Sequence, residues 1–276
     1  MTLPYAEVIG DPIIQSKSPI IHRHWLQALG MDGDYRHAHV TAEGLEAFLA
    51  TRRSDENWRG CNVTMPHKQA IMPLLDVLDP LAQQVGAVNT VVRGADGRLT
   101  GYNTDVDGVA EPLSALVSRQ DAHAYIIGAG GAARAAIFGV SRGAAATTSI
   151  FNRTAHKADE LAILAKAPSG KGHPLTGLIP THDHSHIIVN ATSMGMGGQN
   201  PVPIDLSGFA ADTIVFDMVY APLETPLLAQ ARAQGLRTID GLAMLIGQGA
   251  VAFEKFFGAP PPRDNNDAAL RALLTA

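Results

Sequence analysis

The sequence predicts an α/β protein of two domains, the second of them built on a doubly wound parallel sheet. Three observations lead to this fold class. The chain has 276 residues, a length that favours two domains or one large one. Hydrophobic residues make up 46% of it, which is enough to build real cores. From about Asp121 onward, buried strands alternate with helices, as they do around a parallel sheet.

Short strands and helices are predicted for the first third of the chain. Tyr5–Gly10 is expected to be a strand that ends at a Gly-Asp-Pro turn. A helix then runs to Leu29, with Ser18 as its N-cap and Pro19 at the first helical position. The other elements are a helix at 45–51, a strand at 60–64 stopped by Pro66, a strand at 87–92, and a hairpin turn at 95–98 before a strand at 99–102. This part is therefore α/β with a partly antiparallel edge.

Strands and helices alternate in the prediction for the second part. Strands are expected at 122–127, 147–151, 186–190, 213–217 and 237–239. Helices are expected at 132–142, 155–167, 226–234, 242–257 and 268–274, and the run Ala259-Pro260-Pro261-Pro262 separates the last two.

Composition and charge exclude several classes of function. The net charge is −5 and no basic stripe is visible, so nucleic acid is not an expected partner. Cys61 is the single cysteine, which rules out an intrachain disulfide and a thiolate zinc cage and fits a small core residue. Residues 1–11 carry Glu7 and no Lys or Arg, unlike a signal peptide, and no uncharged apolar run reaches about 18 residues. We therefore expect a soluble, cytoplasmic protein without a membrane partner.

A glycine-rich turn indicates a dinucleotide. The run Gly128-Ala129-Gly130-Gly131-Ala132-Ala133 fits G-x-G-x-x-A between a strand and a helix. The first glycine permits the tight turn, the second lets the backbone approach a pyrophosphate, and the small third residue lets helix and strand pack closely. The alternative is a purely structural turn of an Ala-rich α/β protein.

Basic residues after the next strand favour NADP(H) over NAD. A NAD site would have an acid about 20 residues after the glycines, to accept a hydrogen bond from the ribose 2′-hydroxyl. Here the strand ends in Asn152-Arg153-Thr154, with Lys157 one turn further on. Cations at this place suit a 2′-phosphate, and the alternative is a solvated, basic helix start.

Three polar motifs in the first domain suit a small polar ligand. Ser16-Lys17-Ser18-Pro19 offers two hydroxyls and a helix N-terminus to a carboxylate or to ligand hydroxyls. The motif from Asn62 to Lys68 places Asn62 and Thr64 on one face of a strand and a lysine just beyond it. Asn103-Thr104-Asp105 follows another strand end, and a lysine beside an aspartate can deliver a proton to a developing alkoxide. Spacing alone does not establish that this lysine and aspartate meet.

Several histidines are not expected to have a function. His182, Asp183, His184 and His186 look like metal ligands, but they lie in a loop before a strand without complementary ligands, so no metal is predicted. The remaining candidates are expected on the surface or on helix faces: His22, His24, His37 and His39.

The motifs occur in an order that resembles one enzyme family over nearly the whole chain. They are Gly10-Asp11-Pro12-Ile13, Ser16-Lys17-Ser18-Pro19, Asn62-Val63-Thr64-x-Pro66-x-Lys68, Gly86-Ala87-Val88-Asn89-Thr90, Asn103-Thr104-Asp105, Gly128-Ala129-Gly130-Gly131, Asn152-Arg153-Thr154, Asn190-Ala191-Thr192-Ser193-Met194-Gly195, Asp217-Met218-Val219-Tyr220 and Gly241-Leu242…Gln248. This series resembles the shikimate dehydrogenase family.

The resemblance implies a fold, an activity and partners. It implies a substrate-binding and catalytic domain at 1–105, a Rossmann NADP-binding domain at 106–241, and a return of the C-terminal helices, 242–276, to the first domain. The implied reaction is the reversible, NADP-dependent reduction of 3-dehydroshikimate to shikimate, on the pathway to aromatic amino acids. NADP is the implied cofactor and a small molecule the implied substrate. A monomer or homodimer is expected.

The resemblance also assigns roles to residues. The catalytic pair would be Lys68 and Asp105. Substrate would be held by Ser16, Ser18, Asn62, Thr64, Asn89, Tyr220 and Gln248. Besides the glycine-rich turn and Asn152, Arg153, Thr154 and Lys157, the cofactor would be held by Thr192, Ser193, Met194, Met218 and Gly241.

Two departures from the family pattern bear on these assignments. The family continues Asn-Thr-Asp directly with Gly, whereas Val106 and Asp107 here precede Gly108. Asp107 is therefore the alternative acid, although adjacency to Asn103-Thr104 favours Asp105. His67 stands where many family members have an aromatic ring, which bears on the substrate rather than on the reaction.

Two other functions stay open at this point. One is a paralogue on the same fold that acts on quinate or aminoshikimate. The other is a non-catalytic NADP-sensing module. The lysine, aspartate and hydroxyl set argues against the sensor, because nucleotide binding alone requires none of these side chains.

Overall fold

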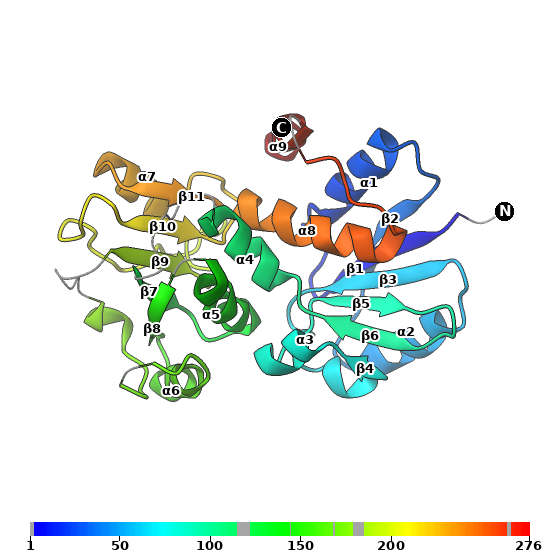
Figure 1. Ribbon diagram of the computed structural model, residues 1–276, viewed down its shortest axis with the longest axis horizontal. Coiled ribbons are helices and arrows are strands. Elements are labelled where there is room, and N and C mark those ends of the chain that lie inside the picture. The colour runs from blue at the N-terminus through cyan, green and yellow to red at the C-terminus, as the bar shows by residue number, and fades with distance from the viewer. Residues whose placement is uncertain (1–2, 115–121, 144, 168, 179–184, 264–265) are drawn as a thin grey trace. The chain divides into compact units, whose positions relative to one another are not determined.

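The computed structural model describes residues 3–114, 122–143, 145–167, 169–178, 185–263 and 266–276 (Figure 1). The chain forms two compact units, one of residues 1–104 with 248–276 and one of residues 105–247. Helix α8 (Gly241–Phe257) begins in the second unit and ends in the first. The predicted two-domain α/β class is confirmed, and so is the return of the C-terminal helices to the first domain.

The first unit is built on a mixed sheet. Its described strands are β1 (Tyr5–Gly10), β2 (Asp34–His39), β3 (Trp58–Val63), β4 (Val77–Leu78), β5 (Thr90–Arg93) and β6 (Leu99–Tyr102), in the spatial order β2-β1-β3-β5-β6-β4. β1 pairs parallel with β2 and β3, whereas β5 is antiparallel to β3 and β6, as the partly antiparallel edge predicts. The helices are α1 (Ser18–Ala28), α2 (Leu45–Arg53), α3 (Pro80–Val85), the end of α8, and α9 (Asn266–Thr275), which lies beside α1 in Figure 1.

Apolar side chains cover both faces of this sheet. Leu45 and Leu49 of α2 pack on one face with Trp58, and Phe256 of α8 packs on the other. At Gly60, with φ of +148°, a Cβ would lie 2.1 Å from the Val91 carbonyl oxygen and 2.8 Å from the Phe256 ring. Glycine is therefore required for α8 to approach the strand at this point.

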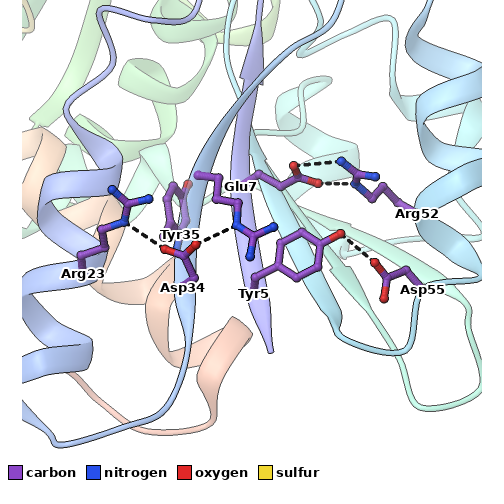
Figure 2. Close-up of polar contacts among 8 residues, drawn as sticks. Tyr5, Glu7, Arg23, Asp34, Tyr35, Arg52 and Asp55 are labelled. Carbon is purple, nitrogen blue, oxygen red and sulfur yellow. Dashed lines mark hydrogen bonds and ion pairs between the residues drawn. The ribbon is translucent and has the colours of Figure 1, made fainter. Parts of the chain in front are cut away.

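Ion pairs lie on the edge strand β2 and on β1 beside it (Figure 2). Asp34 accepts hydrogen bonds from Arg23 at 3.0 Å and from Arg36 at 2.7 Å. Buried Glu7 accepts two hydrogen bonds from Arg52, at 2.5 and 3.2 Å. These charged partners explain why the polar sequence of β2 forms an edge strand without exposing a flat apolar edge.

Four elements of the first part and its junction were not predicted. These are β2, β4, α3 and α4 (Asp105–Ser114). β2 is polar and takes its conformation from pairing with β1, which a single-strand pattern does not contain. For α3 a signal was present, because Asp79 caps the helix by accepting from the Leu81 N–H and Pro80 follows it.

The second unit is built on a parallel sheet. Its described strands are β7 (Ala122–Ile127), β8 (Ala145–Phe151), β9 (His186–Asn190), β10 (Ile214–Asp217) and β11 (Arg237–Ile239), in the order β11-β10-β9-β7-β8. The helices are α4, α5 (Gly131–Gly143), α6 (Ala155–Leu164), α7 (Pro226–Ala233) and the start of α8. The strand order reverses between β7 and β9, which is where doubly wound sheets bind ligands.

Helix α4 packs closely on α5 because of small residues. A Cβ on Gly139 would lie 2.5 Å from the Val109 side chain, so the two helices could not come as near with any larger residue there. Buried side chains of α4 and α5, such as Leu113 and Val140, form one core with the sheet residue Ile126. In the part of the chain that the structure describes, no helix has the length and apolarity needed to cross a membrane.

Candidate active site

Two neighbouring strands of the first unit bring the predicted substrate residues Asn62 and Asn89 together. The antiparallel register pairs Asn62 of β3 with Thr90 of β5, so their side chains share one face. The Asn62 Nδ2 donates to Thr90 Oγ1 at 3.0 Å, and Thr90 Oγ1 donates to Asn89 Oδ1 at 3.0 Å. Asn62, Asn89 and Thr90 are all buried, which strengthens hydrogen bonds among them.

The network continues from Asn89 to residues far away in the chain. Its Nδ2 donates to Thr104 Oγ1 at 3.0 Å and lies 3.5 Å from Gln248 Oε1. Its Oδ1 accepts from the Thr104 N–H at 2.7 Å. The structure therefore joins Asn62, Asn89 and Gln248, three of the predicted substrate residues, in one buried polar cluster. Thr90 and Thr104 were missed as members, although both belong to the motifs read from the sequence.

Ser16 and Ser18 lie next to one another at the start of α1. Their hydroxyls are 3.2 Å apart, and the Ser18 N–H donates to Ser16 Oγ at 3.4 Å. The prediction of Ser18 as N-cap is wrong: the N-cap is Lys17, with φ of −87° and ψ of 0° and no capping side chain, and Ser18 is the first helical residue. The Ser18 hydroxyl is thus not used to cap its own helix.

The segment after β3 carries Thr64, His67 and Lys68. Thr64 follows the strand directly, and its N–H donates to the Ile9 carbonyl at 2.9 Å. His67 is fully buried, with its Nε2 2.6 Å from the Val40 carbonyl oxygen, so its ring fixes this segment to the unit. The partly buried Lys68 is held through its backbone, where its carbonyl accepts from the Val88 N–H at 2.8 Å. The departure at His67 therefore has a structural role in this chain.

Asp105 and Asp107 both lie in the first turn of α4, where negative charge is favourable. Asp105 is buried, at 4% exposure. Asp107 is partly exposed and forms an ion pair with Arg142 of α5, with 3.2 Å between Oδ1 and Nη1. The inserted Val106 is itself buried in the core of this unit, and it separates the two carboxylates onto different faces of the helix.

The glycine-rich turn lies at the carboxyl end of β7, beside the loop after β9. Gly128 has φ of +123°, and a Cβ there would lie 3.0 Å from Thr192 Cγ2 and 3.1 Å from the Ala191 carbonyl oxygen. Gly130 is exposed, and a Cβ built on it would meet nothing within 4 Å. Gly131 then begins α5, and Ala133 is fully buried against the core. Each small residue thus has the position that the dinucleotide motif requires.

Asn190 and Asp217 position the loops that follow β9 and β10. Asn190 Nδ2 donates to Asp217 Oδ1 at 2.9 Å, and Asn190 Oδ1 accepts from Thr192 Oγ1 at 2.7 Å. Asp217 also accepts from the Val219 N–H at 3.0 Å and from Thr225 Oγ1 at 2.6 Å. Burial raises the pKa of the Asp217 carboxyl, against these hydrogen bonds, which lower it.

The residues predicted to hold the cofactor lie at those same loops or next to them. Thr192 Oγ1 accepts from the Met194 N–H at 3.0 Å, and Ser193 Oγ donates to Gln199. Met218 and Tyr220, both partly buried, flank Val219 after β10. A Cβ added to Gly241 would lie only 2.5 Å from the Val219 backbone, so glycine allows the close approach there. Asn190 and Asp217 belong to the sequence motifs but were not predicted as site residues, although both end adjacent strands of the sheet. Tyr220, predicted to bind substrate, belongs to the second unit.

Basic side chains stand at the start of α6. Arg153 and Lys157 are exposed, and the first turn contains no acidic residue. The N-cap Thr154 makes no capping hydrogen bond with its side chain. Asn152 Nδ2 donates to the Thr154 carbonyl at 3.0 Å and so holds the turn before the helix. A helix N-terminus with two cations and no acid is suited to bind an anion.

The histidines and the single cysteine are the remaining residues for which the sequence makes predictions. His182 and His184 lie outside the described residues, and among residues that are described no cluster suited to a metal ion is found. His22 lies on a helix face, one of the two places predicted for it, and this face of α1 is buried, with the ring stacked on Tyr35 at 4.0 Å between ring centroids. Cys61 is buried, as predicted for a core residue.

Comparison with known proteins gives the same family as the motifs. Residues 8–91 match the shikimate dehydrogenase substrate binding domain, and residues 241–271 match the shikimate 5'-dehydrogenase C-terminal domain. The shikimate dehydrogenase (NADP(+)) of Sphingopyxis alaskensis is 52% identical over 273 residues, which are 99% of this chain and 97% of the relative.

Solved structures agree over their whole length. The shikimate 5-dehydrogenase of Thermus thermophilus, in complex with NADP(H) and shikimate, has a TM-score of 0.85 at 34% identity and covers 98% of this chain and 99% of its own. The quinate dehydrogenase of Corynebacterium glutamicum, in complex with NAD, has a TM-score of 0.86 at 32% identity and covers 99% of both chains. The resemblance inferred from the motifs is confirmed, and this chain belongs to the shikimate dehydrogenase family.

Proposed function

We propose that the chain is an NADP-dependent shikimate dehydrogenase that reversibly reduces 3-dehydroshikimate to shikimate. The observation that carries this assignment is the 52% identity to a curated shikimate dehydrogenase (NADP(+)) over 99% of the chain. The polar cluster of the first unit and the glycine-rich turn of the second supply groups of the kinds that this reaction needs. Residues 1–104 with 248–276 would bind the substrate and residues 105–247 the cofactor.

The residues of the second unit fit NADP. The exposed backbone at Gly130 leaves room for a pyrophosphate at the start of α5. Arg153 and Lys157, beside a helix start without acids, suit the 2′-phosphate that distinguishes NADP from NAD. Thr192, Met194, Met218 and their neighbours at the ends of β9 and β10 would hold the rest of the cofactor. When bound, NADPH supplies the hydride that reduces the ring ketone.

The residues of the first unit suit a polyhydroxylated ring carboxylate. Ser16 and Ser18 offer hydroxyls at the N-terminus of α1, where a carboxylate is favoured. The amides of Asn62, Asn89 and Gln248 offer donors and acceptors for ring hydroxyls. Because the Asn62 amide donates to the Thr90 hydroxyl and the Asn89 amide donates to Gln248, these side chains are oriented before substrate binds, which lowers the entropic cost of recognition.

Proton transfer is assigned to Lys68, with Asp105 as its partner. Reduction of a ketone leaves an alkoxide, which needs a proton at the former carbonyl oxygen. A lysine ammonium both stabilises the negative charge on that oxygen and donates the proton, and a nearby carboxylate favours the charged form of the lysine. The family resemblance supports this pairing, and the burial of Asp105 supports it over Asp107.

The decisive experiment is an activity panel with purified protein. Shikimate, quinate and aminoshikimate are each offered with NADP and with NAD, and the nicotinamide absorbance is followed. The proposal expects the highest kcat/KM for shikimate with NADP. Quinate is the second candidate, because a quinate dehydrogenase is 32% identical over 99% of this chain. Binding of NADP without turnover of any of the three substrates would instead support the sensing module.

Two finer assignments complete the proposal. We propose a monomer or homodimer, as expected from the resemblance to the family. A cytoplasmic location is proposed because the reaction draws on the NADP pool of central metabolism. Light scattering on the eluting protein distinguishes monomer from dimer, and a larger assembly would contradict the first assignment.

A further inference from the structure

Tyr35 is a fully buried phenol on an otherwise polar strand. On β2 its neighbours Asp34 and Arg36 form ion pairs at the surface, whereas Tyr35 points into the unit and is 0% exposed (Figure 2). A buried tyrosine hydroxyl needs a hydrogen-bond partner, and leaving it without one is costly. Its partner is Asn62, with 2.5 Å between the hydroxyl oxygen and Oδ1.

The orientation of the Asn62 amide follows from a group that can only accept. The backbone carbonyl of Asn89 lies 3.4 Å from the Asn62 side chain, and a carbonyl oxygen has no proton to give. Nδ2 must therefore face Asn89, and Oδ1 must face Tyr35. Since Oδ1 is also only an acceptor, the Tyr35 hydroxyl is the donor in this contact.

The donor–acceptor direction of the Tyr35–Asn62 hydrogen bond determines the direction of the later hydrogen bonds in the cluster. With Nδ2 of Asn62 donating to Thr90 Oγ1, the Thr90 hydroxyl has its own proton available for Asn89 Oδ1. That leaves Asn89 Nδ2 to donate toward Thr104 and Gln248. If the Asn62 amide were reversed, its Oδ1 would face the Asn89 carbonyl oxygen, and two acceptors would meet. The hydrogen bonds from Asn62 to Thr90 and from Thr90 to Asn89 would then be disturbed. Tyr35 thus stands at the donor end of a chain of hydrogen bonds that reaches the predicted substrate residues.

The ring of Tyr35 is itself held in place. His22 of α1 stacks on it at 4.0 Å with 9° between the ring planes, and Trp25 and Phe253 lie around His22. Burial lowers the pKa of His22 to about 3, so its ring is neutral near pH 7 and brings no charge to the cluster. This stack fixes the plane in which the phenol ring lies and hence the place of its hydroxyl.

We infer that Tyr35 is a positioning residue for the dehydrogenase: its hydroxyl donates to Oδ1 and so holds the Asn62 amide in the orientation that the Asn89 carbonyl requires and, through Thr90, holds the Asn89 side chain. The inference rests on the proposed function, because it assigns Tyr35 to the binding of shikimate rather than to folding alone. Tyr35 does not act on the reacting atoms. Its loss should therefore raise the KM for shikimate more than it lowers kcat and should leave the KM for NADP unchanged.

The first test is Tyr35→Phe, which removes the hydroxyl and keeps the stacked ring. We expect the KM for shikimate to rise about 3- to 10-fold, the effect of losing one neutral hydrogen bond. Tyr5→Phe is the matched control: Tyr5 lies on the neighbouring strand β1, and its hydroxyl donates to Asp55 at 2.7 Å rather than to the cluster (Figure 2). Its KM for shikimate should equal that of the wild type. Unchanged KM in Tyr35→Phe, with normal activity in the wild type, would overturn the inference and leave the proposed function standing.

The second test asks whether Tyr35 acts through Asn62. In an Asn62→Ala background, Tyr35→Phe should cause no further rise in KM, since the amide it orients is gone. Equal effects in both backgrounds would assign Tyr35 a separate, structural role and overturn the inference.

A third test applies if Tyr35→Phe does not fold. Thr90→Val then breaks the same chain of hydrogen bonds one step further on, and Thr90→Ser keeps it. A raised KM in Thr90→Val with rescue in Thr90→Ser supports the inference, and equal KM values in the two overturn it. A wild-type protein without shikimate-dependent reduction of NADP would remove both the proposed function and this inference.

Discussion

Asp107 is paired with Arg142, at 3.2 Å between Oδ1 and Nη1, on an outer face of α4 and α5. Asp105, two residues earlier, is buried. Successive residues of a helix are about 100° apart, so these two carboxylates point to nearly opposite sides of α4. Asp107 joins two helices of the second unit, and Asp105 is the aspartate that we propose as the partner of Lys68.

The two aspartates can be told apart by substitution. We expect Asp105→Asn to lower kcat strongly, because a neutral amide no longer favours the charged lysine. Asp107→Asn should be nearly silent in kcat and should cost at most about 1 kcal/mol of stability, as is usual for an exposed ion pair. Steady-state kinetics with shikimate and NADP measures both. A large kcat defect in Asp107→Asn with a mild one in Asp105→Asn would reverse the assignment.

Lys68→Ala tests the proposed proton donor. We expect kcat to fall by roughly 10²- to 10⁴-fold, the usual range for general acid–base catalysis. Binding of shikimate should fall much less, because the serines and amides remain. If Lys68 and Asp105 act as a unit, the double variant Lys68→Ala/Asp105→Asn should lose far less than the product of the two single losses. Fully multiplicative losses would show that the two residues act independently.

The sequence predicted the second unit better than the first for a physical reason. Strands such as β7 and β9 are buried on both faces and read as continuous apolar runs, so their ranges Ala122–Ile127 and His186–Asn190 were predicted correctly. β2 is polar and exists because β1 lies beside it, a relationship that is absent from local periodicity. The helix that begins at Asp105 was not predicted, since Gly108 and Pro112 within it weaken the local helix signal.

In the candidate site, too, features set by neighbouring residues were predicted, whereas contacts between residues far apart in the chain were not. Glycine geometry at Gly128 and Gly130 follows from local steric rules, and the sequence therefore predicted the turn. The bond from Tyr35 to Asn62 joins residues 27 positions apart on strands that are not adjacent in the sheet, and no spacing rule predicts it. The burial of His22 was not predicted for a related reason: it depends on Tyr35 and on Phe253 of the returning helix α8.

Cofactor choice should depend on Arg153. Replacement by aspartate, Arg153→Asp, puts a negative charge where the 2′-phosphate is proposed to bind. The loss of one charge-assisted hydrogen bond is worth about 1.5–3 kcal/mol, or about ten- to a hundredfold in affinity for NADP. Affinity for NAD should be unchanged or improved, since its 2′-hydroxyl can donate to the new carboxylate. Titration calorimetry with both nucleotides measures the ratio.

The control for that experiment is a charge reversal elsewhere in the second unit. Lys166 is exposed and lies beyond the C-terminal end of α6, about 14 Å along the helix from Lys157, so Lys166→Asp makes the same change in net charge away from Arg153. It should leave both affinities as they are at physiological ionic strength, because distant exposed charges are screened. Equal losses of NADP and NAD affinity in Arg153→Asp would mean that the arginine supports the fold rather than the 2′-phosphate.

The stability of the first unit should fall in acid because of His22. Its pKa is lowered by burial from 6.5 to about 3, so below pH 6.5 the unfolded chain binds a proton that the folded chain does not. The folded state therefore loses about 1.4 kcal/mol for each pH unit below 6.5, until pH approaches 3. His22→Phe removes this group. From pH 7 to pH 5 its free energy of unfolding should gain about 2 kcal/mol relative to the wild type.

Urea unfolding followed by tryptophan fluorescence measures this effect, since both tryptophans, Trp25 and Trp58, belong to the first unit. His22→Leu differs in size from His22→Phe and provides a second variant. The two can differ in stability at pH 7 because of packing, but both should show the same gain on acidification. A constant difference from the wild type between pH 7 and pH 5 would mean that His22 is protonated in the folded protein.

Recognition of the substrate carboxylate is the task proposed for Ser16 and Ser18. Because the α1 N-cap is Lys17, replacing Ser18 removes no capping bond, whereas replacing Ser16 removes the acceptor of the Ser18 N–H at 3.4 Å. Ser16→Ala/Ser18→Ala should therefore cost at most about 1 kcal/mol of stability. The KM for shikimate should rise about tenfold or more, since one hydrogen bond to a charged group is worth about 1.5–3 kcal/mol. The KM for NADP should not change. Thr51→Ala/Ser54→Ala removes two exposed hydroxyls of the same unit, both bonded only to local carbonyls, and should leave each KM at its wild-type value. If the serine double variant binds shikimate normally in calorimetry, the carboxylate is held elsewhere in the first unit.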